Sequence, residues 1–311
     1  MPPKKFPSVD LEQILSAARL PAMPQSALRI LEVSRDPDAG VYELAVSIEA
    51  DPGLTVQVLR FVNSSYFGFR YEISSVKQAV ALVGMRTVKH FALYSAVFSL
   101  IPNPRCGRFD LKKLWQDSLR RALFSRRMSR LLTSDEAEES FAAALLQDMA
   151  VPLLAKEIPG AYDALFEARR NGAVRLSALE GPAFGWNHAE AAGRMARNWK
   201  LPEAVSTLIE HHLEIDHSVA CAERAPARSA VALSALLPSL ADEGWPERAV
   251  FEKGYAQVRP SGAPTIAELL AAVDEDFADF APVLKVSEPR RSLAAMSAEA
   301  AETVETAEVG G

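Results

Sequence analysis

Apolar residues recur at helical spacing through most of the chain, and several of these runs begin at a capping residue. After Asp51 and Pro52, apolar side chains fall at positions 54, 58, 59 and 62, on one face of a helix. Aspartate accepts hydrogen bonds from the free amides of a first turn, and proline there loses no needed donor. Asp110 precedes a long amphipathic segment through Leu132 in the same way. No stretch reads as a set of alternating strands, so we predict an all-α fold.

Breaks in this pattern divide the chain. Residues 101–107 are rich in proline and glycine and predict a corner between an N-terminal helical lobe, residues 10–102, and a second lobe, residues 108–285. Within the second lobe, residues 141–155 are almost all apolar, which predicts one buried helix. Helical spacing between positions 238 and 279 predicts a C-terminal extension packed on this lobe. From position 286 large apolar residues are almost absent, so we expect residues 286–311 to be disordered.

Composition narrows the classes of function. The net charge of −6 argues against a global attraction to nucleic acid, and we expect no nucleic-acid partner. The two cysteines, Cys106 and Cys221, form no C-x-x-C pair and predict neither a disulfide scaffold nor a thiolate zinc site. The first residues lack the apolar core of a secretory signal, and no apolar run approaches the ~20 residues of a membrane span. We therefore expect a cytoplasmic protein without membrane insertion.

Several short motifs resemble the HDOD domain family, which is related to the HD metal-dependent phosphohydrolases. In the first half they are LPAMP at 20–24, DPGL at 51–54, NSSYFG at 63–68 and ISSVKQAV at 73–80. In the second half they are LWQDS at 114–118, ALLQDM at 144–149, GWNHAE at 185–190, WKLP at 199–202 and HH at 211–212. The resemblance covers about residues 15–215 and implies a two-lobed helical bundle, with an HD-like second lobe, that serves bacterial signalling.

The same resemblance indicates a degraded metal site. Active HD hydrolases place histidine and aspartate around one or two metals, which supply hydroxide near neutral pH. Here Asp117 stands at the early histidine, and the His-Asp pair is Gln147-Asp148. No acidic residue lies between positions 224 and 241, where the late aspartate belongs. We expect a vestigial pocket without metal or cofactor, formed by Asp117, Gln147, Asp148, His188, His211 and His212.

Structural roles compete with a ligand-binding role at each of these residues. Asp148 sits in an apolar segment and can simply bond to a histidine or a backbone amide. His211 and His212 are adjacent and point about 100° apart on a helix, so only one can face the pocket squarely.

A second set of residues is a candidate partner or ligand surface: Asn63, Tyr66, Phe67, Arg120, Arg121 and Arg127. The first three lie in the NSSYFG loop, where they can cap a helix and wedge into the core or, alternatively, anchor a partner. The arginines lie in the basic segment 110–132, whose charged side is by default a solvated face.

We therefore predict a non-catalytic regulatory module that binds a signalling protein or a small, phosphorylated ligand. Two other functions stay open. One is a divergent metal-dependent phosphohydrolase that uses Asp117, Asp148, His188 and His211. The other is a nucleotide or nucleic-acid binder that uses the basic helix face, with salt-sensitive affinity.

Overall fold

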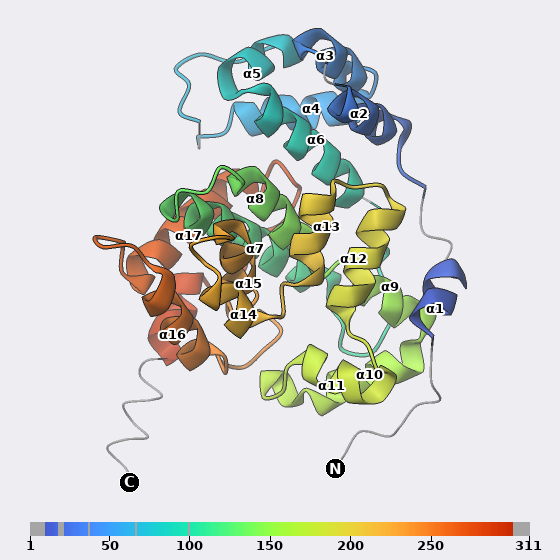
Figure 1. The fold of residues 1–311 in the computed structure, drawn as a ribbon, viewed down its shortest axis with the longest axis vertical. Coiled ribbons are helices and arrows are strands. Elements are labelled where there is room, and N and C mark those ends of the chain that lie inside the picture. The colour runs from blue at the N-terminus through green and yellow to red at the C-terminus, as the bar shows by residue number, and fades with distance from the viewer. Residues whose placement is uncertain (1–9, 18–21, 37, 66, 99, 301–311) are drawn as a thin grey trace.

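The fold is helical throughout the part of the chain that the computed structural model describes, which is residues 10–17, 22–36, 38–65, 67–98 and 100–300. Within these ranges there is no strand, so the predicted all-α class is confirmed. Helices α2–α6 form an upper lobe, and most of the remaining helices form a larger lobe below it (Figure 1).

The N-terminal lobe contains α2 (Gln25–Arg35), α3 (Val41–Glu49), α4 (Pro52–Val62), α5 (Val76–Val83) and α6 (Met85–Phe98). Asp51 caps α4 as expected, because its side chain accepts from the Leu54 amide at 3.0 Å. Ser75 caps α5 through the Gln78 amide at 3.2 Å. A turn with a left-handed Gly68 follows α4.

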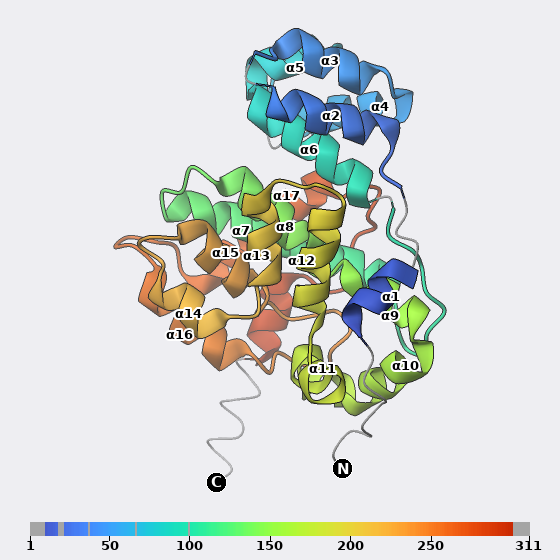
Figure 2. The ribbon, with the colours of Figure 1, turned by 45° about the vertical axis from the view of Figure 1, so that its right-hand side comes forward.

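Helix α1 (Leu11–Ala17) belongs with the second lobe, which corrects the lobe boundary predicted at residue 10. It contacts α12 (His188–Asn198) and buries Leu11, Ile14 and Leu15. Figure 2 shows α1 beside α9 and α10, away from the upper lobe. The capping and spacing signals that predict helices do not say which lobe a short amphipathic helix joins.

The second lobe is built around α7 (Leu111–Leu131), which Asp110 caps through the amides of Lys112 and Lys113. The other helices are α8 (Ala137–Leu146), α9 (Ala150–Glu157), α10 (Pro159–Ala168), α11 (Leu176–Phe184), α13 (Glu203–Glu210), α14 (Ile215–Ala220), α15 (Pro226–Ser234), α16 (Arg248–Val258) and α17 (Ile266–Phe280), with a 3-10 turn at Arg170–Gly172. Helices α8, α15 and α17 pack against α7.

The predicted single helix over residues 141–155 is wrong. The chain leaves α8 after Leu146, turns through residues 147–149, and starts α9 at Ala150. The apolar side chains on both sides of the turn are buried, so hydrophobic pattern alone could not reveal the break. The turn brings Gln147 and Asp148 to the edge of a cavity.

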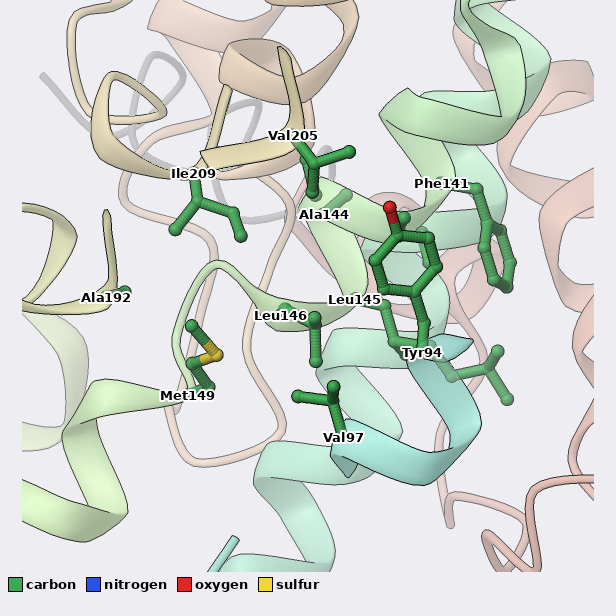
Figure 3. Packing of buried hydrophobic residues seen from close by; sticks show 14 of the residues in the cluster. Tyr94, Val97, Phe141, Ala144, Leu145, Leu146, Met149, Ala192, Val205 and Ile209 are labelled. Carbon is green, nitrogen blue, oxygen red and sulfur yellow. The ribbon is translucent and has the colours of Figure 1, made fainter. Parts of the chain in front are cut away.

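Helix α6 joins the two lobes by packing on α8. Figure 3 shows Tyr94 and Val97 of α6 beside Leu145 and Leu146 of α8. All four side chains are at most 2% exposed, so the junction is a continuation of the core. The junction also contains Phe61, whose ring is stacked on Phe91 at 4.0 Å.

The expected disorder from residue 286 is wrong for residues 286–300. This segment crosses α7 and ends in a helical stretch, residues 293–300. Leu293 is fully buried, and its amide donates to Asp274 at 2.9 Å. Gln116 of α7 holds the carbonyl of Ser287 at 2.7 Å. Residues 301–311 lie outside the described part of the chain.

Candidate functional site

A cavity of about 180 Å³ opens in the second lobe, between α7, the turn that joins α8 to α9, and the start of α12. Its walls combine apolar and charged side chains. The polar ones include Lys113, Asp117, Arg121, Gln147, Asp148, Arg169, Arg175, His188, His212, Ser239, Asp242 and Glu247, and the apolar ones include Phe109, Leu114, Val151, Phe166 and Leu237. The cavity therefore contains five of the six residues predicted for the vestigial pocket.

Asp148 is the centre of the charged part of this pocket. One carboxylate oxygen, Oδ2, accepts a hydrogen bond from the guanidinium of Arg121, which reaches across from α7. The other oxygen, Oδ1, lies 3.4 Å from His188 Nε2 and 3.8 Å from His212 Nε2. Burial disfavours the ionised carboxylate, but Arg121 and the two histidines outweigh it and hold the pKa of Asp148 well below its ordinary value.

His188 is the first residue of α12, where Asn187 caps the helix and a left-handed Gly185 ends α11. Its Nδ1 lies 2.6 Å from Glu180 Oε2, and its backbone amide donates to the same oxygen at 2.9 Å. Burial lowers the pKa of His188, yet Glu180 and Asp148 raise it to about 9. Tyr162 donates to the second oxygen of Glu180 at 2.7 Å, so this buried carboxylate is fully bonded.

The two adjacent histidines face different surroundings, as their spacing predicted. His212 is buried, and its Nδ1 lies 2.7 Å from the Ile209 carbonyl, which leaves Nε2 facing Asp148. Burial, outweighing the attraction of Asp148, lowers the pKa of His212 to about 3, so it is neutral at pH 7. His211 instead pairs with Glu214 at 2.6 Å, outside the cavity, so its predicted place in the pocket is wrong.

Asp117 and Gln147 line the cavity without taking a ligand's position. Asp117 accepts from Ser239 Oγ at 2.7 Å and from the Leu240 amide at 3.1 Å, so it holds the loop that follows α15. Burial raises the pKa of Asp117 even though Arg121 and Arg120 oppose the shift. Gln147 Oε1 accepts a hydrogen bond from the Ser234 hydroxyl at 3.4 Å.

The site can be tested for its fit to a metal ion. Asp148, His188 and His212 each offer one ligand atom, and these atoms lie within 4.8 Å of one another. Imidazole and carboxylate suit zinc and similar ions. However, the Arg121 guanidinium already supplies the positive charge at Asp148. Gln147 offers only a neutral amide, and Asp117 is bonded to Ser239 and Leu240. As the chain stands, these residues do not fit a metal centre.

Three hydrogen-bond donors in the cavity wall lack an acceptor among the described residues. They are Nε of Arg121, Nε of Arg169 and Nε2 of Gln147, all of them buried. Arg169 uses its terminal nitrogen on Asp242, at 2.8 and 2.9 Å, which leaves Nε without a partner. A buried donor without an acceptor costs about 1–3 kcal/mol, so these three donors weaken the packing around the cavity.

Part of the predicted basic surface of α7 is buried. Arg120 is 1% exposed and donates to the Arg291 carbonyl, and Arg126 is 2% exposed with its guanidinium 3.9 Å from the Phe141 ring centre. Arg121 points into the cavity, and Arg127 bonds to Asp276 at 2.7 Å. The assignment of Arg120 to an exposed partner surface is therefore wrong, whereas Lys112 and Arg130 remain exposed.

In the NSSYFG loop the structural role dominates where it can be described. Asn63 bonds to both the amide and the carbonyl of Ile73, at 2.7 and 2.8 Å, and so closes the loop. The Phe67 ring packs edge-on against Phe61 at 5.0 Å. Tyr66 lies outside the described residues. Phe67 and Arg127 nevertheless share the wall of a groove of about 660 Å³ with Arg130, Leu131, Pro264 and Leu269.

The structure adds candidate site residues that the sequence did not single out. Glu180 and Tyr162 fix the orientation of His188, whereas Arg169, Asp242 and Ser239 shape the cavity. The role of Arg121 at Asp148 was also missed, because its position in a basic segment pointed to solvent. Only a contact between segments distant in sequence reveals these roles.

The comparisons identify the family. A family model described as HDOD domain matches residues 20–215, so the chain belongs to the HDOD domain family. An uncharacterized protein of Treponema pallidum (strain Nichols) is 26% identical over 207 residues, which is 65% of this chain and 40% of that protein. The chain thus spans less than half of this relative.

Solved structures share the fold. An HDOD domain protein of unknown function from Geobacter sulfurreducens has a TM-score of 0.60 at 20% identity, with 96% of both chains covered. A Shewanella amazonensis SB2B protein described as "Putative phosphohydrolase" has a TM-score of 0.59 at 19% identity, with 93% of both chains covered. In the described part of the present chain, no helix is both long and apolar enough to cross a bilayer.

Proposed function

We propose that this chain is a regulatory module of bacterial signalling that works in the cytoplasm by binding and not by catalysis. Its ligand is a small anion held in the cavity beside Asp148. The observation that carries this proposal is the set of cationic side chains that line one cavity, Lys113, Arg121, Arg169 and Arg175. Oxyanions such as phosphate groups offer several acceptor oxygens to such donors.

Inorganic phosphate is the simplest probe of the proposal. A ligand that binds only the folded state raises the unfolding midpoint with concentration. We expect such a rise for the native chain, with chloride at matched ionic strength as the reference. Arg169→Gln should weaken phosphate binding by about tenfold or more, since a charge-assisted bond contributes about 1.5–3 kcal/mol.

Arg197→Gln is the matched control for this experiment. Arg197 is also an arginine in a double ion pair, with Glu203 at 2.9 Å and Glu210 at 2.6 Å, but it lies on α12 away from the cavity lining. This variant should bind phosphate as the native chain does. Equal phosphate responses in the native chain and in folded Arg169→Gln would refute the anion site.

The proposal also includes a protein partner, for which we favour the groove lined by Phe67 and Arg127. The groove combines a residue of the N-terminal lobe with residues of the second lobe. The affinity of a partner bound there would therefore depend on the relative position of the two lobes. A photo-crosslinking residue at Arg130, on the groove, should capture a defined protein in cells. The same residue at Arg197 should not, and equal capture at both positions would count against the groove.

A metal-dependent phosphohydrolase is the competing candidate, favoured by the convergence of Asp148, His188 and His212. For this function a divalent ion would have to displace Arg121. The metal content of the native chain, measured by mass spectrometry after exchange with manganese, iron or zinc, separates the two candidates. About one equivalent of metal, lost in Asp148→Ala together with phosphodiester hydrolysis, would favour the hydrolase.

A further inference from the structure

Arg121 supplies the positive charge at the carboxylate that a metal ion would use as a ligand. Its guanidinium approaches Asp148 from α7 and donates to Oδ2, while the two histidines face Oδ1 of the same carboxylate. The side chain of Arg121 is only 13% exposed, so the ion pair is largely withdrawn from solvent. A buried carboxylate needs such a compensating charge, and here the chain itself provides it.

The histidines keep the orientation that metal ligands need. A carbonyl only accepts hydrogen bonds, so His212 Nδ1, 2.7 Å from the Ile209 oxygen, carries a proton and Nε2 can offer a lone pair. His188 Nδ1 is likewise bonded to a carboxylate, Glu180, at 2.6 Å, which leaves Nε2 directed at Asp148. Metal-ligating histidines are held by outer carboxylates and carbonyls in this way.

Formal charges show why Arg121 and a divalent ion exclude each other. Asp148 and Glu180 contribute two negative charges, and both are buried. With Arg121 removed and both histidines neutral, a divalent cation leaves the group neutral. With Arg121 retained, the same cation leaves an excess positive charge in a buried site, which is costly. The nearby acids Asp117 and Asp242 do not relieve it, because each is bonded to groups of its own.

We propose that Arg121 is an intramolecular substitute for the metal ion, and that removal of its charge opens a zinc site at Asp148, His188 and His212. Two imidazoles and one carboxylate form a three-ligand set that is typical of open zinc sites. The inference concerns a cation at Asp148 and does not depend on the anion site proposed above.

The experiment compares metal binding by folded variants. Arg121→Ala, and Arg121→Gln as a second variant of larger volume, should each bind about one equivalent of zinc, against less than about a tenth in the native chain. Cobalt in place of zinc should then give the visible absorption of a four-coordinate site. Arg121→Lys, which keeps a positive charge, and Arg169→Ala, which removes a cavity arginine that does not touch Asp148, should not gain zinc.

The ligands are checked by adding Asp148→Ala or His212→Ala to Arg121→Ala, and each addition should abolish the gained zinc. Circular dichroism establishes which variants fold. The inference is overturned if both folded Arg121 variants bind no more zinc than the native chain. It is also overturned if the native chain holds one equivalent with Arg121 in place. Failure of phosphate binding would leave these outcomes unchanged, so the two proposals fail separately.

Discussion

At the scale of single residues, the pocket depends on how its buried charges are balanced. The negative charge of Asp148 is balanced by Arg121 and His188. The positive charge of His188 is balanced in turn by the buried carboxylate of Glu180. His212 stays neutral and contributes a lone pair and no charge. Such a network is costly to break at one member, because the remaining partner is left as an uncompensated buried charge.

Glu180→Gln tests the charge of His188. Burial lowers the pKa of His188 and Glu180 is the strongest influence that raises it, so the variant should show a pKa well below about 9. The histidine resonances in a pH titration by NMR measure this directly. An unchanged value would mean that Asp148 alone sustains the imidazolium.

The same shift gives a stability profile. The folded pKa of about 9 exceeds the ordinary value of 6.5, so His188 contributes stability that is fully present below pH 6.5 and is lost as the pH rises through 9. Chemical denaturation at pH 6.5 and pH 9.5 should show this loss in the native chain and a smaller one in Glu180→Gln. His217→Gln, which removes an exposed histidine, serves as the control.

The sequence predicted which residues belong to this network better than it predicted the contacts that each of them makes. Asp148, His188 and His212 were placed in the pocket by motif order, and the structure brings them together. His211 and Arg120 were assigned wrongly because a neighbour in sequence or a charged side chain says little about which way it points. Glu180 and Arg121 act through partners 8 and 27 residues away, which spacing within one helix cannot reveal.

At the scale of helices, caps and breakers made most elements predictable. Asp51, Asp110 and the corner at residues 101–107 lie where the chain starts or leaves helices. The turn at residues 147–149 was not predictable, because both flanking helices are buried and carry no solvent-facing stripe to mark an end. The turn places Asp148 at the cavity. The helix boundary that the sequence did not predict is therefore also the one that positions a candidate site residue.

His188 is the first residue of α12 and His212 follows the C-cap of α13, and the spacing of these two helices depends on Gly193. A Cβ at this position would lie 2.7 Å from Glu210 Cβ. Gly193→Ala should therefore force the helices apart and lower the free energy of unfolding by about 1–3 kcal/mol. Denaturant unfolding provides the measurement.

Gly160→Ala is the matched control within helix α10. A Cβ there meets nothing within 4 Å, and the position is exposed. Alanine is the better helix former, so this variant should be neutral or more stable by up to about 1 kcal/mol. If both variants change stability equally, close approach of α12 and α13 is not what requires glycine at position 193.

At the scale of the whole molecule, α8 lies between the lobe junction and the pocket. One side of it packs on Tyr94 and Val97 of α6 (Figure 3). Its C-terminal end leads directly into Gln147 and Asp148. A ligand that displaced the turn at residues 147–149 would therefore also shift the contact between α6 and α8, where the lobes meet. This continuity gives the proposed anion site a physical connection to a groove that contains Phe67.

The C-terminal segment, residues 286–300, packs on the second lobe, and Leu293 is its buried side chain. The side chain is fully buried, and the amides of Leu293 and Ala294 are held by Asp274 at 2.9 and 3.0 Å. Leu293→Ala should lower the free energy of unfolding by about 2–4 kcal/mol, because it leaves a cavity beside α7 and α17. Denaturant unfolding measures the loss, and limited proteolysis should show faster cleavage of the segment.

Ala295→Ser is the control, since Ala295 is exposed on the same helical stretch and its replacement should change stability by less than about 0.5 kcal/mol. The composition of residues 286–300 predicts disorder because the segment contains few apolar side chains. The structure indicates that those few suffice when the polar backbone is bonded to Gln116, Arg120 and Asp274. A stability of Leu293→Ala equal to that of Ala295→Ser would show that the compositional prediction was correct and that the segment does not hold the lobe together.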